Sequence, residues 1–150
     1  MTAATAGPAR SASSRRPVAL LLRVVLAACV VTSAVVHLQL WNDGMKNVDV
    51  VGPAFLLNGV GGLVLGVLLL VWRSVWPLLG AIGFGVATLG AFVVATSPAG
   101  LFGVHSRWEG TPEWVSAITE ALAIVLGVVT ILVERRLVAA APGTSVPTAA

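Results

Sequence analysis

Charged residues are scarce in this sequence: they make up only 10% of its 150 residues, whereas 57% are hydrophobic and the mean hydropathy is +0.98. Soluble domains carry about 25% charged residues. A soluble chain of this length could not bury so much apolar surface, because a small fold leaves a large share of its surface exposed. The composition therefore excludes an ordinary soluble domain and predicts an integral membrane protein whose main partner is the lipid bilayer.

Other features that the sequence lacks narrow its function. It has one cysteine, Cys29, which excludes an internal disulfide and leaves the redox compartment open. Its nine basic residues form no stripe interleaved with aromatic residues, which argues against nucleic acid as a partner despite the net charge of +3. There is no CxxCH motif for covalent haem, no nucleotide-binding loop and no acyl-transfer motif. The cofactor stays unknown, and a non-enzymatic role is favoured over an enzyme.

What the sequence does have is four long apolar segments, at residues 18–40, 50–72, 75–96 and 114–133. Each is close to the ~20 residues that a helix needs to cross a bilayer. No period-2 alternation indicates membrane strands. The pattern predicts an all-α fold, an integral membrane four-helix bundle over residues 18–136. The small, polar segments 1–17 and 137–150 are predicted to be disordered cytoplasmic tails.

Short polar stretches mark the helix ends. Only Arg73–Val75 separates the second and third spans, which predicts a tight antiparallel hairpin. The stretch "TPEW" predicts a helix start with Thr111 as the N-cap and Pro112 at the first helical position.

Basic residues predict the orientation, because they are enriched on the cytoplasmic side of membrane proteins. Seven of the nine flank one predicted face: Arg10, Arg15, Arg16, Arg23, Arg73, Arg135 and Arg136. The two on the other face are Lys46 and Arg107. The sequence therefore predicts a multi-pass protein of the cell (plasma) membrane with both termini inside (N-in/C-in).

The first span has an alternative interpretation. The stretch "LAAC" (Leu26 to Cys29) fits a lipoprotein cleavage box. However, Arg23 interrupts the apolar core of such a signal, and the apolar run continues past Cys29 to Leu40. A plain first span is favoured, with Arg23 extending to the cytoplasmic face.

Small residues recur at four-residue spacing and predict close helix contacts. The second span has Gly62 and Gly66, a GxxxG pair; the third has Gly83, Ala87 and Ala91; the fourth has Ala123 and Gly127. A compact bundle is the favoured interpretation. The alternative is that the Gly62/Gly66 face joins two copies into a homo-oligomer. Assembly with a larger membrane complex is a separate possibility for a protein of this kind.

The main candidate for function is Glu120, a carboxyl group about a third of the way into the fourth span. A charge at such depth costs on the order of 2.5–3.5 kcal/mol, so residues of this kind face an interior and are functional candidates. Asn58, His37 and Ser33 lie at similar depths in other spans, and His105 lies in the loop before the fourth span. We expect these residues to form an outer-leaflet polar pocket around Glu120. The alternative is that Glu120 serves packing alone.

A metal site is a weaker hypothesis. Two histidines and a carboxylate, His37, His105 and Glu120, are ligands that suit zinc or a similar ion. No HxxxH or HxxE spacing supports the site, so the metal stays unknown.

The stretches "HLQLW" (His37 to Trp41) and "VGPAFLLNGVGGLVLG" (Val51 to Gly66), followed by a glutamate early in the last span, carry a resemblance. They resemble a group of uncharacterised small four-span membrane proteins of high-GC actinobacteria over about residues 18–136. The resemblance implies a four-span fold and supports His37, Asn58 and Glu120 as a set, but it implies no activity. The arrangement also looks broadly like that of DoxX-type proteins, although their motif residues are not matched.

Two functions follow from these observations. The first is an integral membrane accessory or binding protein that uses the polar pocket around Glu120. The second is a small transporter or membrane redox-type enzyme in which Glu120 carries a proton or cation. The cytoplasmic halves of the second and third spans, "LVLGVLLLVW" and "PLLGAIGFGV", contain no polar group to carry an ion. The first function is therefore favoured.

Overall fold

The structure is a computed structural model that describes residues 9–140. The predictions for residues 1–8 and 141–150 lie outside this described part. Four α-helices follow one another: α1 (Ala9–Asn42), α2 (Val51–Val71), α3 (Val75–Ala95) and α4 (Thr111–Ala139). A short 3₁₀ helix, η1 (Met45–Asn47), lies between α1 and α2. All four α-helices are long and apolar enough to cross a membrane, which confirms the predicted helical class and the number of candidate spans.

The helix ends differ somewhat from the predicted boundaries. Helix α1 begins at Ala9, inside the segment predicted to be a disordered tail, and α4 continues to Ala139, beyond the predicted end of the fourth span at residue 133 and into the predicted C-terminal tail. Helix α4 begins at Thr111 with Gly110 as its N-cap, so the cap lies one residue before the predicted position. Cys29 is buried in the middle of helix α1.

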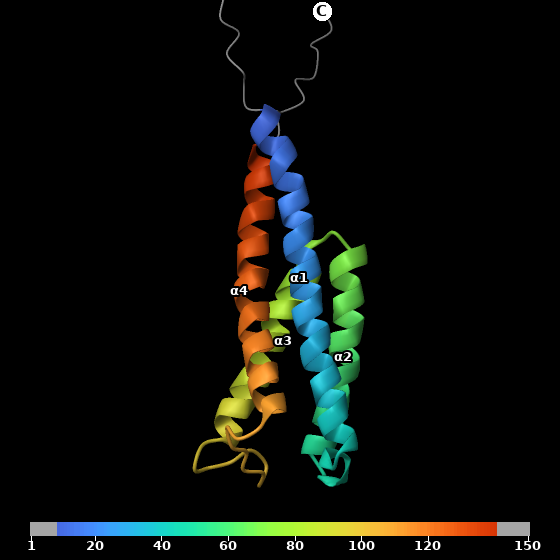
Figure 1. The fold of residues 1–150 in the computed structure, drawn as a ribbon, viewed down its shortest axis with the longest axis vertical. Helices are drawn as coiled ribbons and strands as arrows, with labels where there is room; N and C mark the ends of the chain where they lie inside the picture. Colours follow the sequence, from blue (N-terminus) through green and yellow to red (C-terminus); the bar gives the residue numbers. More distant parts are fainter. Residues whose placement is uncertain (1–8, 141–150) are drawn as a thin grey trace, which may run out of the picture.

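The helices are neighbours in the order α2, α1, α4, α3 (Figure 1). Helix α1 packs along both α2 and α4, and α4 packs along α3. Helices α2 and α3 are joined by the short turn Trp72–Ser74, but they contact each other much less and diverge away from this turn (Figure 1). The predicted tight hairpin therefore forms only at its turn. Below, the end with the turn Trp72–Ser74 is the turn end, and the end with segments 43–50 and 96–110 is the loop end.

Glycines explain this order, because they allow two helix backbones to approach closely. A Cβ atom on Gly62 would lie 2.8 Å from the Ala34 Cβ, and one on Gly66 would lie 2.5 Å from the Val31 Cγ2. Both neighbours belong to α1. The Gly62/Gly66 face is therefore covered by α1 within the chain.

On α3 the packing glycine is Gly85 and not Gly83, so the predicted α3 stripe was wrong. A Cβ on Gly85 would lie 2.6 Å from the Glu120 backbone oxygen, whereas one on Gly83 would meet nothing within 4 Å. Two residues along a helix correspond to a rotation of about 200°, so these glycines lie on nearly opposite sides. The face that packs on α4 carries Gly85.

Arg23 lies at the turn end and is buried, with 4% of its surface exposed. Its Nε and Nη2 donate to the two carboxylate oxygens of Glu134 on α4, at 2.6 and 2.9 Å. Its Nη1 donates to the Trp72 carbonyl at 3.1 Å, and Nη2 donates to the Ser74 carbonyl at 2.8 Å. Arg23 thus satisfies the Trp72 carbonyl, which is at the end of α2 and has no partner within that helix, and it also contacts Ser74, the N-cap of α3. The sequence analysis did not predict that Arg23 is buried and paired with Glu134.

Candidate functional site

Glu120 lies buried between α4 and α1, with 2% of its surface exposed. Its Oε1 accepts hydrogen bonds from Ser116 Oγ at 2.8 Å and from Ser33 Oγ at 2.9 Å. Ser116 is one turn earlier on α4, and Ser33 comes from α1. A buried carboxyl group needs such partners, because leaving it without them would cost a large desolvation penalty.

His37 completes this group one helical turn after Ser33. Its Nδ1 lies 2.8 Å from the Ser33 backbone carbonyl. A carbonyl can only accept, so Nδ1 carries a proton and donates. The other ring nitrogen, Nε2, lies 3.9 Å from Glu120 Oε1. We call Ser33, His37, Ser116 and Glu120 the polar cluster.

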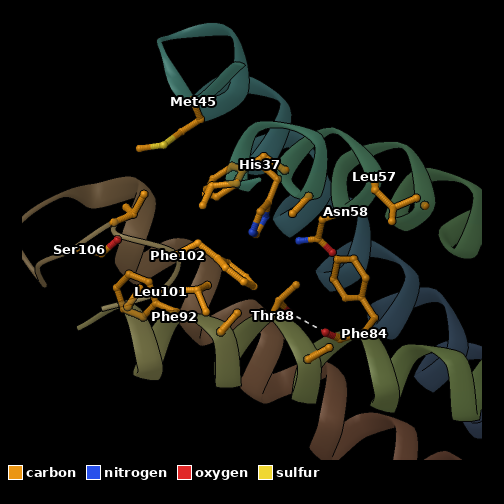
Figure 2. Close-up of a pocket in the computed structure, with 18 residues that line it drawn as sticks. His37, Met45, Leu57, Asn58, Phe84, Thr88, Phe92, Leu101, Phe102 and Ser106 are labelled. Carbon is orange, nitrogen blue, oxygen red and sulfur yellow. Dashed lines mark hydrogen bonds between the residues drawn. The ribbon is translucent and has the colours of Figure 1, made fainter. Parts of the chain in front are cut away.

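A cavity of about 460 Å³ lies beside the polar cluster at the loop end, between α2 and α3. Figure 2 shows side chains from α2, α3 and the α3–α4 loop pointing into it. Most of the lining is apolar, and it includes all four phenylalanines of the chain: Phe55, Phe84, Phe92 and Phe102. Four lining residues have polar side chains: His37, Asn58, Thr88 and Ser106. The cavity thus has the size and the mainly apolar lining of a small-molecule site.

His37 is the only member of the polar cluster that lines the cavity. Ser33 is completely buried, and Ser116 and Glu120 are almost so. The predicted pocket around Glu120 is therefore divided into two parts. One part is a buried group of hydrogen bonds, the other is an apolar cavity, and the His37 ring separates them.

Asn58 lies on the cavity side of this division. Its Nδ2 is buried and has no hydrogen-bond partner in the described part of the chain. Figure 2 shows this nitrogen pointing toward the His37 ring. The Thr88 hydroxyl, by contrast, donates to the Phe84 carbonyl at 2.6 Å. Buried donors without a partner are rare and call for an explanation.

The α3–α4 loop closes the loop end of the cavity. Leu101 and Val104 exchange two backbone hydrogen bonds of 2.9 Å around the residues Phe102 and Gly103. Phe102 has φ 48°, an uncommon conformation for a residue other than glycine. Trp108 anchors the loop, because its ring lies 4.5 Å from that of Phe92 and 4.8 Å from that of Trp114.

The predicted site residues meet only in part. Ser33, His37 and Glu120 come together, while Asn58 lines the cavity and makes no hydrogen bond to Glu120. His105 is exposed, and its Nε2 lies 3.3 Å from the Pro98 carbonyl in the loop. Within residues 9–140, no group of three or more His, Cys, Asp or Glu side chains is placed to hold a metal ion. Of the weak metal candidates, His37 and Glu120 therefore lie close together, whereas His105 lies apart from them in the loop.

Sequence reasoning missed Ser116 and the phenylalanine lining. Ser116 could have been found, because it precedes Glu120 by four residues and so lies on the same helix face. The phenylalanines come from two helices and a loop, and no spacing along the chain links them.

The polar cluster is not arranged for nucleophilic catalysis. A serine nucleophile needs a histidine nitrogen that can take its proton and an open path for the substrate. Here His37 Nε2 is directed to Glu120, and Ser33 is completely buried. The cluster fixes the position of the His37 ring at the cavity wall.

Comparisons of the chain with protein-family models, with curated proteins and with solved structures found no match. The resemblance to small actinobacterial membrane proteins stays a prediction. The function is therefore argued from the geometry of the site.

Proposed function

We propose that the protein is a multi-pass binding protein of the cell membrane that holds an apolar molecule in the cavity between α2 and α3. The observation that carries this proposal is the cavity itself. It has a volume of about 460 Å³, and no Asp, Glu, Lys or Arg side chain is among the described residues that line it. A mainly apolar cavity with a few polar groups is typical of small-molecule sites.

The proposed orientation places the turn end inside the cell. Arg73, Arg135 and Arg136 lie toward this end, and basic residues are enriched on the cytoplasmic side. The four helices then form an N-in/C-in bundle, and the cavity lies in the outer leaflet. Because α2 and α3 diverge beside the cavity (Figure 1), a molecule dissolved in the lipid would enter between them.

The polar cluster has a supporting part in this function. Ser33 and Ser116 hold Glu120, and the Ser33 carbonyl holds the His37 ring. His37 therefore presents a fixed face to the cavity. An accessory role in a larger membrane complex is compatible with such a site, with the bound molecule passed to or taken from a partner.

The alternative function, transport of a proton or cation through Glu120, needs polar groups along a path across the membrane. In the described part of the chain, the polar cluster and the Arg23–Glu134 pair lie toward opposite ends of the helices. Buried apolar residues make up the core of the helices: Leu26, Ala27, Val30, Leu69, Leu78, Ala81 and Ala123. This apolar core favours binding over transport.

Photolabelling of the full-length protein in detergent tests the proposal. We expect an apolar phenyl diazirine to label cavity residues such as Met45 and Thr88 in a saturable manner, because a site has a finite capacity. Ala91→Trp places an indole in the cavity and should abolish the saturable labelling. Val64→Trp, on an exposed face of α2, is the matched control and should leave it unchanged. Labelling that rises linearly with probe and ignores Ala91→Trp would rule out a binding site.

A further inference from the structure

We propose that the turn end holds a second binding site, a groove that binds one anionic phospholipid by its headgroup and by part of an acyl chain. The groove shares no residue with the cavity, so this inference goes beyond the proposed function. It lies between the first turn of α3 and the last turns of α4 and has a volume of about 420 Å³. Its lining includes four large apolar residues and two charged ones: Val75, Leu78, Ile131, Val138, Glu134 and Arg135. We call it the α3–α4 groove.

Arg135 carries a charge that no acidic side chain of the protein compensates. Glu134, the other charged residue of the groove, is already used by Arg23, which donates to both of its carboxylate oxygens at 2.6 and 2.9 Å. Arg135 itself is exposed and makes no ion pair within residues 9–140. The next acidic residue along α4 is Glu120, fifteen residues away (135 minus 120), which is roughly 22 Å along the helix axis. The groove therefore offers one free cation to a ligand.

The turn end as a whole is positively charged. Within residues 17–140, four arginines and a single glutamate lie there, which gives a net charge of +3: Arg23, Arg73, Arg135, Arg136 and Glu134. The other five acidic residues of the chain lie toward the loop end. Basic residues next to membrane helices attract anionic headgroups, and basic pockets between such helices bind them. The charge therefore favours a phospholipid with an anionic headgroup over one whose headgroup has no net charge.

Trp76 places the groove at the depth of lipid headgroups. It is the second residue of α3 and is 66% exposed. Tryptophan is enriched where the hydrocarbon of a membrane meets water. Helix α4 lies level with this point, because Arg23 donates both to the Ser74 carbonyl and to Glu134. A headgroup beside Arg135 therefore lies at the membrane surface, where headgroups are found.

The apolar part of the groove extends from Arg135 toward the middle of the helices. Ile131 precedes Arg135 by one helical turn, and Leu78 follows Val75 by about one turn on α3. Leu78 is completely buried and forms the floor of the groove. An acyl chain placed along these residues packs closely against them, and close packing stabilises apolar contacts in lipid. A small soluble anion would contact the arginine alone, so the groove favours a lipid.

Lipid binding to the full-length protein in detergent tests the proposal. We expect native mass spectrometry to show one tightly bound dioleoyl phosphatidylglycerol, and dioleoyl phosphatidylcholine to bind about fivefold more weakly. Arg135→Gln should remove this preference, because the groove loses its free charge. Arg136→Gln is the matched control and should keep most of the preference. It removes the same charge from the next residue, which is exposed and not part of the described lining.

A second pair of variants tests the contact with the acyl chain. Val75→Trp fills the groove without changing its charge and should weaken binding of phosphatidylglycerol at least as much as Arg135→Gln does. Val71→Trp adds the same ring at an exposed position at the end of α2 and should leave binding unchanged. Inorganic phosphate in large excess should not displace the lipid, because it makes no contact with the apolar floor.

Each contrary result overturns a stated part of the proposal. Equal losses in Arg135→Gln and Arg136→Gln would overturn it, because the attraction would then be spread over the whole basic end. Unchanged binding in Val75→Trp would overturn the contact with the acyl chain. Displacement of the lipid by inorganic phosphate would show a site for a soluble anion instead. None of these results affects the cavity, whose saturable photolabelling is measured at the loop end.

Discussion

Two buried polar groups of this molecule differ in how fully their atoms are paired. At the turn end, all three guanidinium nitrogens of Arg23 donate hydrogen bonds, to Glu134 and to backbone carbonyls of Leu69, Trp72 and Ser74. At the loop end, His37 Nε2 lies 3.9 Å from Glu120, beyond hydrogen-bond distance, and Asn58 Nδ2 has no partner among the described residues. A cavity adjoins the second group.

This difference indicates which polar group is structural and which belongs to a binding site. A group whose donors are all used holds helices together and has nothing left to offer a ligand. A group that leaves a buried donor unpaired is less favourable for folding, and here that group adjoins the cavity in which binding is proposed. The Arg23 group at the turn end is therefore interpreted as a structural connection, and the polar group at the loop end as part of a binding site. The predictions that follow test this contrast, from the largest expected effect to the smallest.

The largest effect is expected at the turn end. Glu134→Ala leaves the buried guanidinium of Arg23 without its carboxylate, and we expect it to lower the free energy of unfolding by about 3 kcal/mol. Saturable photolabelling of the folded fraction should stay unchanged, because the cavity is at the other end. Glu109→Ala is the control, since Glu109 pairs with Arg107 at an exposed position. It should cost no more than about 1 kcal/mol. Denaturant unfolding in detergent measures the free energy of unfolding of both variants. Equal decreases in the two variants would contradict a structural role for Arg23.

Gly85 tests whether close backbone contact positions the polar cluster. A Cβ there would lie 2.6 Å from the Glu120 backbone oxygen. Gly85→Ala should therefore cost about 1–3 kcal/mol through overpacking and should also weaken photolabelling. Gly83→Ala adds the same methyl group to α3 in open space, and its better helix propensity should make it neutral or slightly stabilising. If the two variants unfold alike, α3 and α4 do not pack as described.

Substitutions at Glu120 test how much the polar cluster contributes to the stability of the fold. Glu120→Leu removes the acceptor of Ser33 and Ser116. Because a helical serine can donate instead to the carbonyl one turn earlier, we expect a cost of only about 1 kcal/mol. Glu120→Gln keeps an oxygen acceptor and should unfold like the wild-type protein. Glu120→Leu should weaken photolabelling, because the polar cluster that positions the His37 ring loses its carboxyl group, whereas Glu120→Gln should leave labelling nearly unchanged. Wild-type labelling in Glu120→Leu would show that Glu120 has no part in the site.

The sequence predicted the helices well because length and hydropathy are local properties. Four apolar runs became four helices, with ends within a few residues for α2 and α3. It also brought Ser33, His37 and Glu120 together correctly, because all three lie at similar depth on faces with small residues.

The sequence did not predict which helices become neighbours. Which helices pack together depends on the side of each helix on which its glycines lie. That Gly85 packs against α4 while Gly83 lies in open space cannot be recognised without the partner helix. Because α2 packs on α1 and α3 packs on α4, a space remains between α2 and α3. Asn58 and the phenylalanines line this space, which explains why the predicted pocket around Glu120 proved to be centred elsewhere. The ion pair of Arg23 was missed for the same reason, since its partner Glu134 is 111 residues away in the sequence.

The smallest effect on stability is expected at Phe102, and it separates folding from binding most clearly. Phe102 has φ 48° and is 71% exposed, so its ring contributes little to the core while its backbone is strained. Asparagine tolerates this conformation better. Phe102→Asn should therefore raise the free energy of unfolding, by about 1 kcal/mol at most. It should nevertheless weaken photolabelling, because the ring that covers the cavity is gone. Val93→Thr, at an exposed position on α3 outside the cavity lining, is the control and should leave labelling unchanged. A variant that is more stable and binds less would show that the chain keeps a strained phenylalanine for the ligand, whereas unchanged labelling would mean that the loop is only a connection.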